Sequence, residues 1–384
     1  MKNKIAIASA FIAASSFSTA EIVINDFLSF EGFVDMSYSH VDADADNLDI
    51  QESDNSFAVD QVEISWLFDF DPVTAQIDLQ YDEGTDSETA VEQAFATYHL
   101  GNGGAITAGR YASMIGFEAF EPTGLYQYSF AYDLHIPGID TGIPLNADPL
   151  STYEASVGDV TIIPGYANGV KFTYETDTTF FGISLQDEVF GNDGDRLGGD
   201  NDSSYGGEVA FSITMENGLS WFLGGAYEDA DLGDSYMLNT YVTFETGAWI
   251  FAAELSYGES ESNGFAVGAT LADADDKITG GALLGGVDTD EEVLQALIMA
   301  NFAYSDQASV TGRISYVDHE YDVAGAGTIA EVDALKFTLA HGYAFTDNLF
   351  LVNEISYVET GLDTLIGDED IDSIFFAAEL IFSF

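Results

Sequence analysis

Residues 116–166 read GFEAFEPTGLYQYSFAYDLHIPGIDTGIPLNADPLSTYEASVGDVTIIPGY, and this stretch decides how the rest of the chain is interpreted. It contains five of the six prolines, mixes aromatic with acidic residues and keeps neither the strand nor the helix period for long. An irregular segment of this length is uncommon inside a compact fold unless it has a function of its own. Non-helical backbone is tolerated at membrane depth where it lines a water-filled cavity. We therefore expect the stretch to fold into the lumen of a β-barrel as the constriction of a pore.

Segments that alternate apolar and polar residues flank the stretch on both sides. Residues 73–82, VTAQIDLQYD, show the alternation most clearly, with an apolar side chain at every odd-numbered position. Successive side chains of a strand point to opposite faces, so this period turns one face to lipid and the other to a lumen. Sixteen such segments are predicted, at 27–41, 57–70, 73–82, 91–100, 105–115, 167–176, 179–190, 204–214, 219–229, 236–246, 249–259, 291–304, 309–321, 333–344, 349–359 and 372–384.

The connections between these segments alternate between short turns and longer, mostly acidic loops. This is the pattern of an up-and-down barrel with short periplasmic turns and longer outer loops, and an open edge cannot lie in lipid. The pattern predicts an all-β fold: a transmembrane antiparallel up-and-down β-barrel of 16 strands with a long inward-folded loop after the fifth strand. A strand around residues 265–271 would raise the count to 18. A water-soluble β-sandwich is the alternative that the sorted loop lengths disfavour.

The N-terminus resembles an export signal. Lys2 and Lys4 precede an apolar run at residues 5–14, and small residues close the segment at 18–20. The apolar run is too short to span a bilayer, so we expect residues 1–20 to be a signal peptide and residues 21–384 a single transmembrane β-barrel. The absence of cysteine excludes a disulfide scaffold and thiol chemistry.

The charge of the chain is strongly negative, with 67 acidic residues against 8 Lys and Arg. Phosphate binding needs a basic surface, so nucleic acid is not an expected partner. The chain is nevertheless 47% hydrophobic and 14% aromatic, a composition that disordered acidic chains do not have. An exported, aromatic-rich chain without an apolar helix favours the outer membrane of a Gram-negative bacterium.

Two motifs carry a resemblance to a known family. Residues 108–122, AGRYASMIGFEAFEP, lead from the fifth predicted strand into the long stretch, and GYANGVK at 165–171 begins the next strand. With the terminal Phe384, these motifs resemble the OmpL-like β-barrel porin family, and the topology resembles that of the general diffusion porins. The Pro-Glu-Phe-Gly-Gly constriction motif of enteric porins is absent, so their constriction geometry does not transfer residue by residue.

The few basic residues are the most informative candidates for a pore constriction. A charge on the lipid face costs roughly 2–4 kcal/mol at the midplane, so wall cations should point into the lumen. In porins that this chain resembles, wall cations face carboxylates of the inward loop. Glu118 and Glu121 lie near the root of the loop, so we expect them to be the partners of Arg110 and Lys171, with Asp133 a weaker candidate. For Arg313 and Lys336, neutralisation of a neighbouring wall acid is an equal alternative. The predicted constriction set is Arg110, Glu118, Glu121, Asp133, Lys171, Arg313 and Lys336.

No catalytic or cofactor motif supports an enzyme. Gly-x-Ser-x-Gly, His-Glu-x-x-His and phosphate-loop patterns do not occur. Acidic outer loops such as residues 42–46 and 191–195 would bind Ca²⁺ or Mg²⁺ weakly at most, and a solvated surface is the favoured interpretation. No resident cofactor is expected.

The sequence therefore predicts an outer-membrane porin: a cation-preferring, water-filled diffusion channel for small hydrophilic solutes and ions. The resemblance implies a homotrimer, and the expected partners are outer-membrane lipid and lipopolysaccharide. Two alternatives stay open: a substrate-specific outer-membrane channel, and a non-conducting acidic surface barrel that acts as an adhesin or scaffold.

Overall fold

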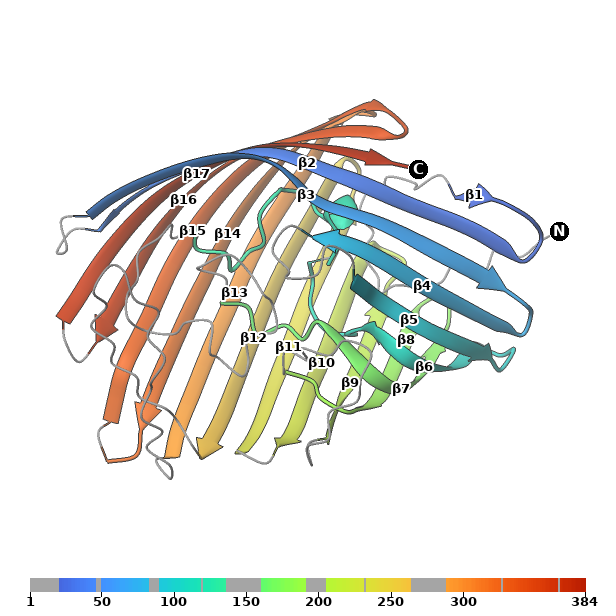
Figure 1. Cartoon of the computed structure of the whole chain (residues 1–384), viewed down its shortest axis with the longest axis horizontal. Helices are drawn as coiled ribbons and strands as arrows, with labels where there is room; N and C mark the ends of the chain where they lie inside the picture. The colour runs from blue at the N-terminus through green and yellow to red at the C-terminus, as the bar shows by residue number, and fades with distance from the viewer. Residues whose placement is uncertain are drawn as a thin grey trace.

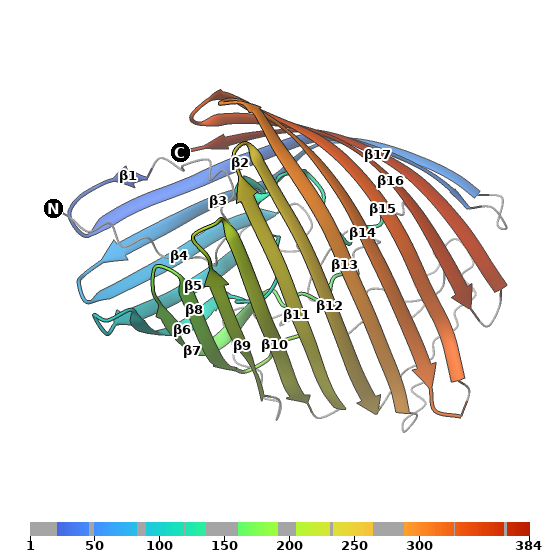
Figure 2. The same cartoon turned by 180° about the vertical axis from the view of Figure 1, so that it is seen from behind.

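The computed structural model describes residues 21–45, 50–82, 90–118, 120–135, 160–190, 205–230, 233–263, 288–325, 327–364 and 367–384. Almost all regular structure in these residues is β-strand, and the strands curve around a common lumen (Figures 1 and 2). The strands are β1 (Ile22–Val23), β2 (Leu28–Ala45), β3 (Ile50–Asp69), β4 (Val73–Asp82), β5 (Ala90–His99), β6 (Gly104–Ala112), β7 (Tyr166–Glu175), β8 (Thr179–Gln186), β9 (Tyr205–Thr214), β10 (Leu219–Ala230), β11 (Gly233–Thr246), β12 (Trp249–Asn263), β13 (Asp288–Ser305), β14 (Ala308–Val323), β15 (Gly327–Thr346), β16 (Leu349–Thr364) and β17 (Gly367–Ser383). A single 3₁₀ turn, η1 (Pro122–Gly124), follows β6.

The strands β2 to β17 form a closed antiparallel barrel. Each pairs with its neighbours in sequence, and β17 returns to pair with β2. Reciprocal backbone hydrogen bonds of 2.9 Å between Gly32 and Phe384 extend this closing seam to the last residue. Strand β1 pairs with β2 and lies at the same end of the barrel as the C-terminus (Figure 1). Closure leaves the barrel strands without an open edge, as lipid requires.

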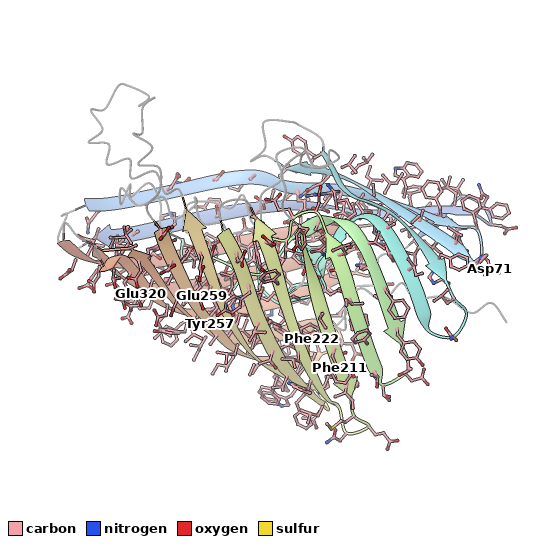
Figure 3. All side chains as sticks on the ribbon, turned by 90° about the horizontal axis from the view of Figure 1, so that it is seen from below. Asp71, Phe211, Phe222, Tyr257, Glu259 and Glu320 are labelled. Atoms are coloured by element: carbon pink, nitrogen blue, oxygen red, sulfur yellow. The ribbon has the colours of Figure 1, made fainter. Side chains whose placement is uncertain are left out.

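Side chains alternate between the outside and the lumen along the strands (Figure 3). On β12, Phe251 and Leu255 are 40% and 47% exposed on the outer face, whereas Glu254 and Ser256 are buried on the inner one. Large apolar side chains of the neighbouring strands, such as Leu238 and Ile298, are likewise exposed. An apolar outer face around a polar interior is the arrangement that a transmembrane barrel requires.

The fold predicted from the sequence is confirmed. The barrel has sixteen strands, and β6, the fifth of them, leads into the long irregular segment. The strands β13 to β17 are longer than the alternation predicted, and β1 was not predicted at all. Residues 265–271, where a further strand was considered, lie outside the described residues. Among the described residues, no helix has the length and hydropathy needed to cross a membrane.

Two register shifts redirect acidic side chains. Between the pairs Asp35–Gln61 and Ser37–Ala58, β3 has one residue more than β2. As a result, the Asp60 side chain does not point to the lipid side, where strict alternation along β3 would place it. On β5, Glu92 is the extra residue between the partners of Asp78 and Leu79. A bulge of one residue re-aims the side chain at that point. Both carboxylates come close to other acidic side chains of the barrel interior.

Candidate pore constriction

The described parts of the inward loop, residues 113–118, 120–135 and 160–165, lie inside the barrel and contact strands far from the root of the loop (Figure 1). Little of the described loop backbone pairs with a strand, and buried N–H groups need an acceptor. Wall glutamates provide that acceptor: Glu208 of β9 for Met114 N (2.9 Å), Glu254 of β12 for Phe117 N (2.8 Å), and Glu354 of β16 for Tyr128 N and Ser129 N (2.9 and 3.0 Å). These hydrogen bonds attach the loop backbone to β9, β12 and β16 and so fix its path.

Apolar packing holds the same loop against the β8–β13 side of the wall. Phe117 lies 5.7 Å from Tyr241, centroid to centroid, and both belong to a buried cluster that includes Met114, Tyr132 and Phe222. A second cluster joins Ile115 and Ile162 of the loop to Val189 and Phe190, which follow β8. It also includes residues of β10, β11 and β13, namely Ala226, Met237 and Val293. The loop is thus part of the packed interior of the barrel.

One buried ion pair links the loop to the wall. Arg313 of β14 donates to the carboxylate of Glu118, and the Arg313 side chain is fully buried. The other acceptor sites of Glu118 receive Ala131 N (2.7 Å) and Gln127 Nε2 (2.7 Å). Arg313 also donates to the carbonyl oxygen of Phe130 (3.0 Å). This pair therefore connects two separate parts of the loop, around Glu118 and around residues 130–131, to β14.

Lys336 of β15 contacts residues 129–135 of the loop. Its Nζ donates to Ser129 Oγ (2.8 Å), to the carbonyl oxygens of Phe130 (2.9 Å) and Asp133 (2.7 Å), and lies 3.1 Å from His135 Nε2. Burial lowers the pKa of His135 well below its ordinary value, and the Lys336 charge adds to this effect. Burial raises the pKa of Asp133 against the opposing influence of Lys336. The lysine is the cation around which this part of the loop is ordered.

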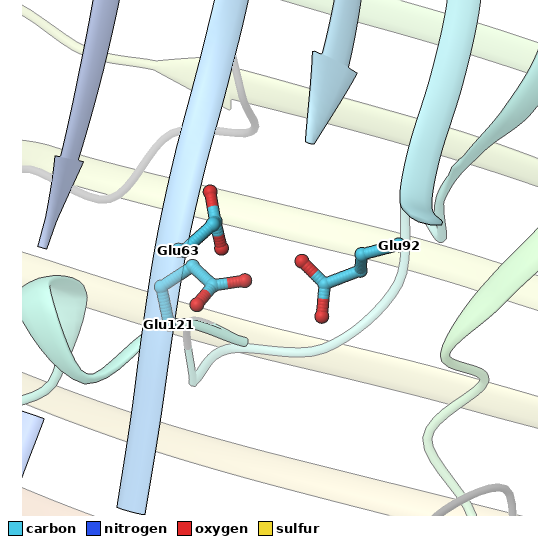
Figure 4. A group of neighbouring side chains, drawn as sticks. All are labelled: Glu63, Glu92 and Glu121. Carbon is cyan, nitrogen blue, oxygen red and sulfur yellow. The ribbon is translucent and has the colours of Figure 1, made fainter. Parts of the chain in front are cut away.

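Glu121 of the inward loop lies against another part of the wall, in an acidic triad with Glu63 of β3 and Glu92 of β5 (Figure 4). Carboxylate oxygens of the three residues lie within 4.8 Å of one another. Gln61 Nε2 and Tyr166 OH donate to Glu121 at 2.8 and 2.9 Å. Burial, and next the charge of Glu92, raise the pKa of Glu121 well above its ordinary value.

The remaining predicted cations contact the root of the loop. Lys171 Nζ lies 4.2 Å from the ring centroid of Tyr111 and 3.4 Å from the carbonyl oxygen of Ala112. Arg110 is 9% exposed, and its Nε donates to the carbonyl oxygen of Glu92 at 3.1 Å. Its neighbour Gly109 has φ 130°, a backbone conformation that favours glycine, and strict alternation ends at this point.

The partners expected for the loop acids are corrected by these contacts. Glu118 pairs with Arg313, and Glu121 joins two further acids, whereas both were expected to face Arg110 and Lys171. The reason is the path of the loop, which crosses the lumen before it turns, so nearness to its root does not select the partner. For Arg313 and Lys336 the alternative was that each neutralises a neighbouring wall acid. Both cations instead contact the loop, so this alternative does not account for their contacts. Gln295 of β13 also holds the loop, since it accepts from Ile162 N at 3.3 Å and donates to the carbonyl oxygen of Val160. The sequence did not predict the roles of Glu354, Gln295 or the bulge residue Glu92, because these roles depend on long-range register.

A group of lumen-side carboxylates, here called the acidic wall, extends over five adjoining strands. Asp35, Asp60 and Glu379 interact electrostatically with one another, and Glu63 interacts in the same way with Asp78 and Glu92. The acidic wall is formed by Asp35 (β2), Asp60 and Glu63 (β3), Asp78 (β4), Glu92 (β5) and Glu379 (β17). Arg313 and Lys336 lie on β14 and β15, outside these strands, so the acidic wall and these two cations occupy different sectors of the barrel.

The closed barrel and its packed inward loop define the class of protein, a porin-type barrel of the outer membrane. The chain matches the family described as "Putative beta-barrel porin-2, OmpL-like" over residues 28–384, and it belongs to that family. No curated protein is significantly similar in sequence.

Solved structures share the fold at low identity. OmpT of Vibrio cholerae is 11% identical with a TM-score of 0.59, covering 95% of this chain and 100% of its own. The trimer form of OmpT is 10% identical with a TM-score of 0.55, covering 93% and 99%. An anion-selective porin from Comamonas acidovorans is 14% identical with a TM-score of 0.56, also covering 93% and 99%. These likenesses concern the fold alone.

Proposed function

We propose that this protein is a water-filled diffusion channel for small hydrophilic solutes and ions, and that it has no enzymatic activity. The observation that carries the proposal is the inward loop, which a closed barrel holds by wall carboxylates, Arg313 and Lys336. A loop fixed in this way narrows the lumen but does not block the passage of small solutes. The proposed constriction set comprises Arg110, Glu118, Glu121, Asp133, Lys171, Arg313 and Lys336.

We further propose that the channel prefers cations. The described residues contain four Lys or Arg side chains, of which Arg313 already neutralises a loop acid. The acidic wall alone contributes six carboxyl groups, and low-dielectric walls focus their field into the lumen.

Reconstitution of the refolded protein into planar bilayers and liposomes tests channel function. We expect discrete conductance steps, together with liposome swelling that becomes slower as uncharged sugars grow larger. Steps that one solute blocks would support a substrate-specific channel instead. Absence of steps from a protein with intact heat-modifiable migration would support the adhesin or scaffold alternative and contradict the proposal.

The assembly that we propose is a homotrimer, exported with cleavage after Ala20 and embedded in lipid and lipopolysaccharide. Its support is the trimer form of OmpT, which shares the fold. Native mass spectrometry of protein extracted in mild detergent should give three chains per particle, and N-terminal sequencing should begin at Glu21. A monomer at all protein concentrations, with conductance closing in single unit steps, would contradict the trimer.

A further inference from the structure

The acidic triad of Glu63, Glu92 and Glu121 combines side chains from three separate segments. Glu63 comes from β3, Glu92 from the bulge in β5 and Glu121 from the inward loop just before η1. Figure 4 shows the three carboxylates pointing toward a shared space between these segments. Their oxygens lie within 4.8 Å of one another, close enough for one ion to contact all three.

Two of these carboxylates have an oxygen that no hydrogen bond satisfies. Glu63 is 6% exposed and Glu92 4% exposed, and the buried Oε2 atom of each has no hydrogen-bond partner among the described residues. The other oxygen of Glu63 accepts from Ser65 Oγ at 2.7 Å. A buried charge or polar atom without a partner is costly and requires an explanation such as a bound ion. The orphaned oxygens therefore point to a ligand that the polypeptide itself does not supply.

Surrounding hydrogen-bond donors orient the triad but leave two of its carboxylate oxygens without a partner in the described part of the chain. Gln61 Nε2 and Tyr166 OH each donate to one oxygen of Glu121, which fixes the plane of that carboxylate. Asp78, the next acid along the wall, already accepts from the amides of Gln76 and Gln93 at 2.9 and 2.7 Å. Such outer contacts orient ligands around a metal ion. Of Asp78 and the three triad residues, only Glu63 and Glu92 therefore keep a buried carboxylate oxygen without a hydrogen-bond partner in the described ranges.

We propose that Glu63, Glu92 and Glu121 bind one divalent cation, and that this cation is calcium. Calcium takes six to eight oxygen ligands at about 2.3–2.6 Å, so two of its ligands lie at most about 5 Å apart, and the triad fits this limit. The ligand set consists of carboxylates, which suit hard cations, and water completes the coordination. The ion ties Glu121 of the inward loop to β3 and β5, on a different sector from Arg313 and Lys336. Without it, three acids would repel one another where the loop meets the wall.

Calcium titration of the EDTA-treated, refolded full-length protein tests this site by isothermal titration calorimetry. About 1 M NaCl reduces the Debye length to about 3 Å and suppresses diffuse attraction of calcium to the acidic outer loops. We expect one saturable site per chain in the wild type. Glu92→Gln and Glu121→Gln should each weaken calcium binding by at least roughly tenfold, in the range seen when a metal site is perturbed. Glu175→Gln, on β7 and outside the triad, should bind like the wild type.

Glu121 lies in the loop, so Glu121→Gln leaves the barrel strands intact, and heat-modifiable migration on SDS gels verifies folding of every variant. Identical titrations of the wild type and both triad variants would overturn the proposal and leave shared protons as the means of neutralising the triad. Tighter binding of Mg²⁺ than of Ca²⁺ would overturn the assignment to calcium. Because binding is measured without conduction, the result is independent of whether the protein proves to be a channel.

Discussion

The double variant Arg313→Gln, Lys336→Gln is expected to release the inward loop from β14 and β15 and to widen the channel. The Arg313 side chain is fully buried against Glu118, and Lys336 donates to loop carbonyl oxygens at 2.7 and 2.9 Å. Removing one partner of a buried ion pair costs roughly 3–5 kcal/mol, because the remaining charge stays buried and unpaired. That cost shifts the equilibrium between docked and undocked loop by a factor of roughly 10² to 4 × 10³.

Liposome swelling with uncharged sugars of increasing size measures this widening without interference from charge. The double variant should admit sugars that the wild type excludes, and its single-channel conductance should rise. Lys171→Gln serves for comparison, since it removes a cation of the constriction set that contacts Tyr111 and Ala112 at the root of the loop, and it should change the size limit less than the double variant does. An unchanged size limit in the double variant, with normal folding, would show that these two cations do not position the constriction.

Neutralising part of the acidic wall is expected to have the largest effect on ion selectivity. Asp35, Asp60 and Glu379 interact with one another, and Asp35 and Glu379 are almost fully buried at the lumen side. In the variant Asp35→Asn, Asp60→Asn, Glu379→Gln the permeability ratio of potassium over chloride should fall markedly. Focused fields in a narrow, low-dielectric passage decide which ions enter, so charges here outweigh charges elsewhere.

The control for this variant removes three acids from exposed turns: Glu216→Gln, Asp306→Asn and Asp347→Asn. The formal charge change is the same, but these side chains lie in solvent, where salt screens them. Their loss should leave the permeability ratio near that of the wild type. Equal effects of the two triple variants would mean that net charge, rather than the acidic wall, sets the preference.

The barrel itself was predictable because its determinants are local. Alternation within segments such as residues 73–82 and the regular spacing of short turns follow from the two-residue period of a strand and from the need to close the sheet in lipid. Residues 116–166 were predicted to lie inside the barrel because they keep no strand period and so could not form part of its wall.

The partners inside the lumen were not predictable in the same way. Glu118 and Arg313 are separated by 195 residues, and the bond from Ser129 N to Glu354 spans 225, so each depends on the path of the whole loop. Asp60 and Glu92 show a second limit, because a bulge of one residue moves a side chain from one face of a strand to the other. Strict alternation assigns both acids to the lipid face, and with them it misses part of the acidic wall and one member of the triad.

An anion-selective porin from Comamonas acidovorans shares the fold at 14% identity, so the fold alone does not predict the proposed cation preference. Selectivity must come from the side chains that line the passage. The most direct measurement is therefore the reversal potential of the wild-type channel across a KCl gradient, with EDTA present. Near 0.1 M, where the Debye length is about 10 Å, we expect a clear cation preference that weakens toward 1 M, where it is about 3 Å. An anion-selective or unselective channel near 0.1 M would contradict the account of the acidic wall.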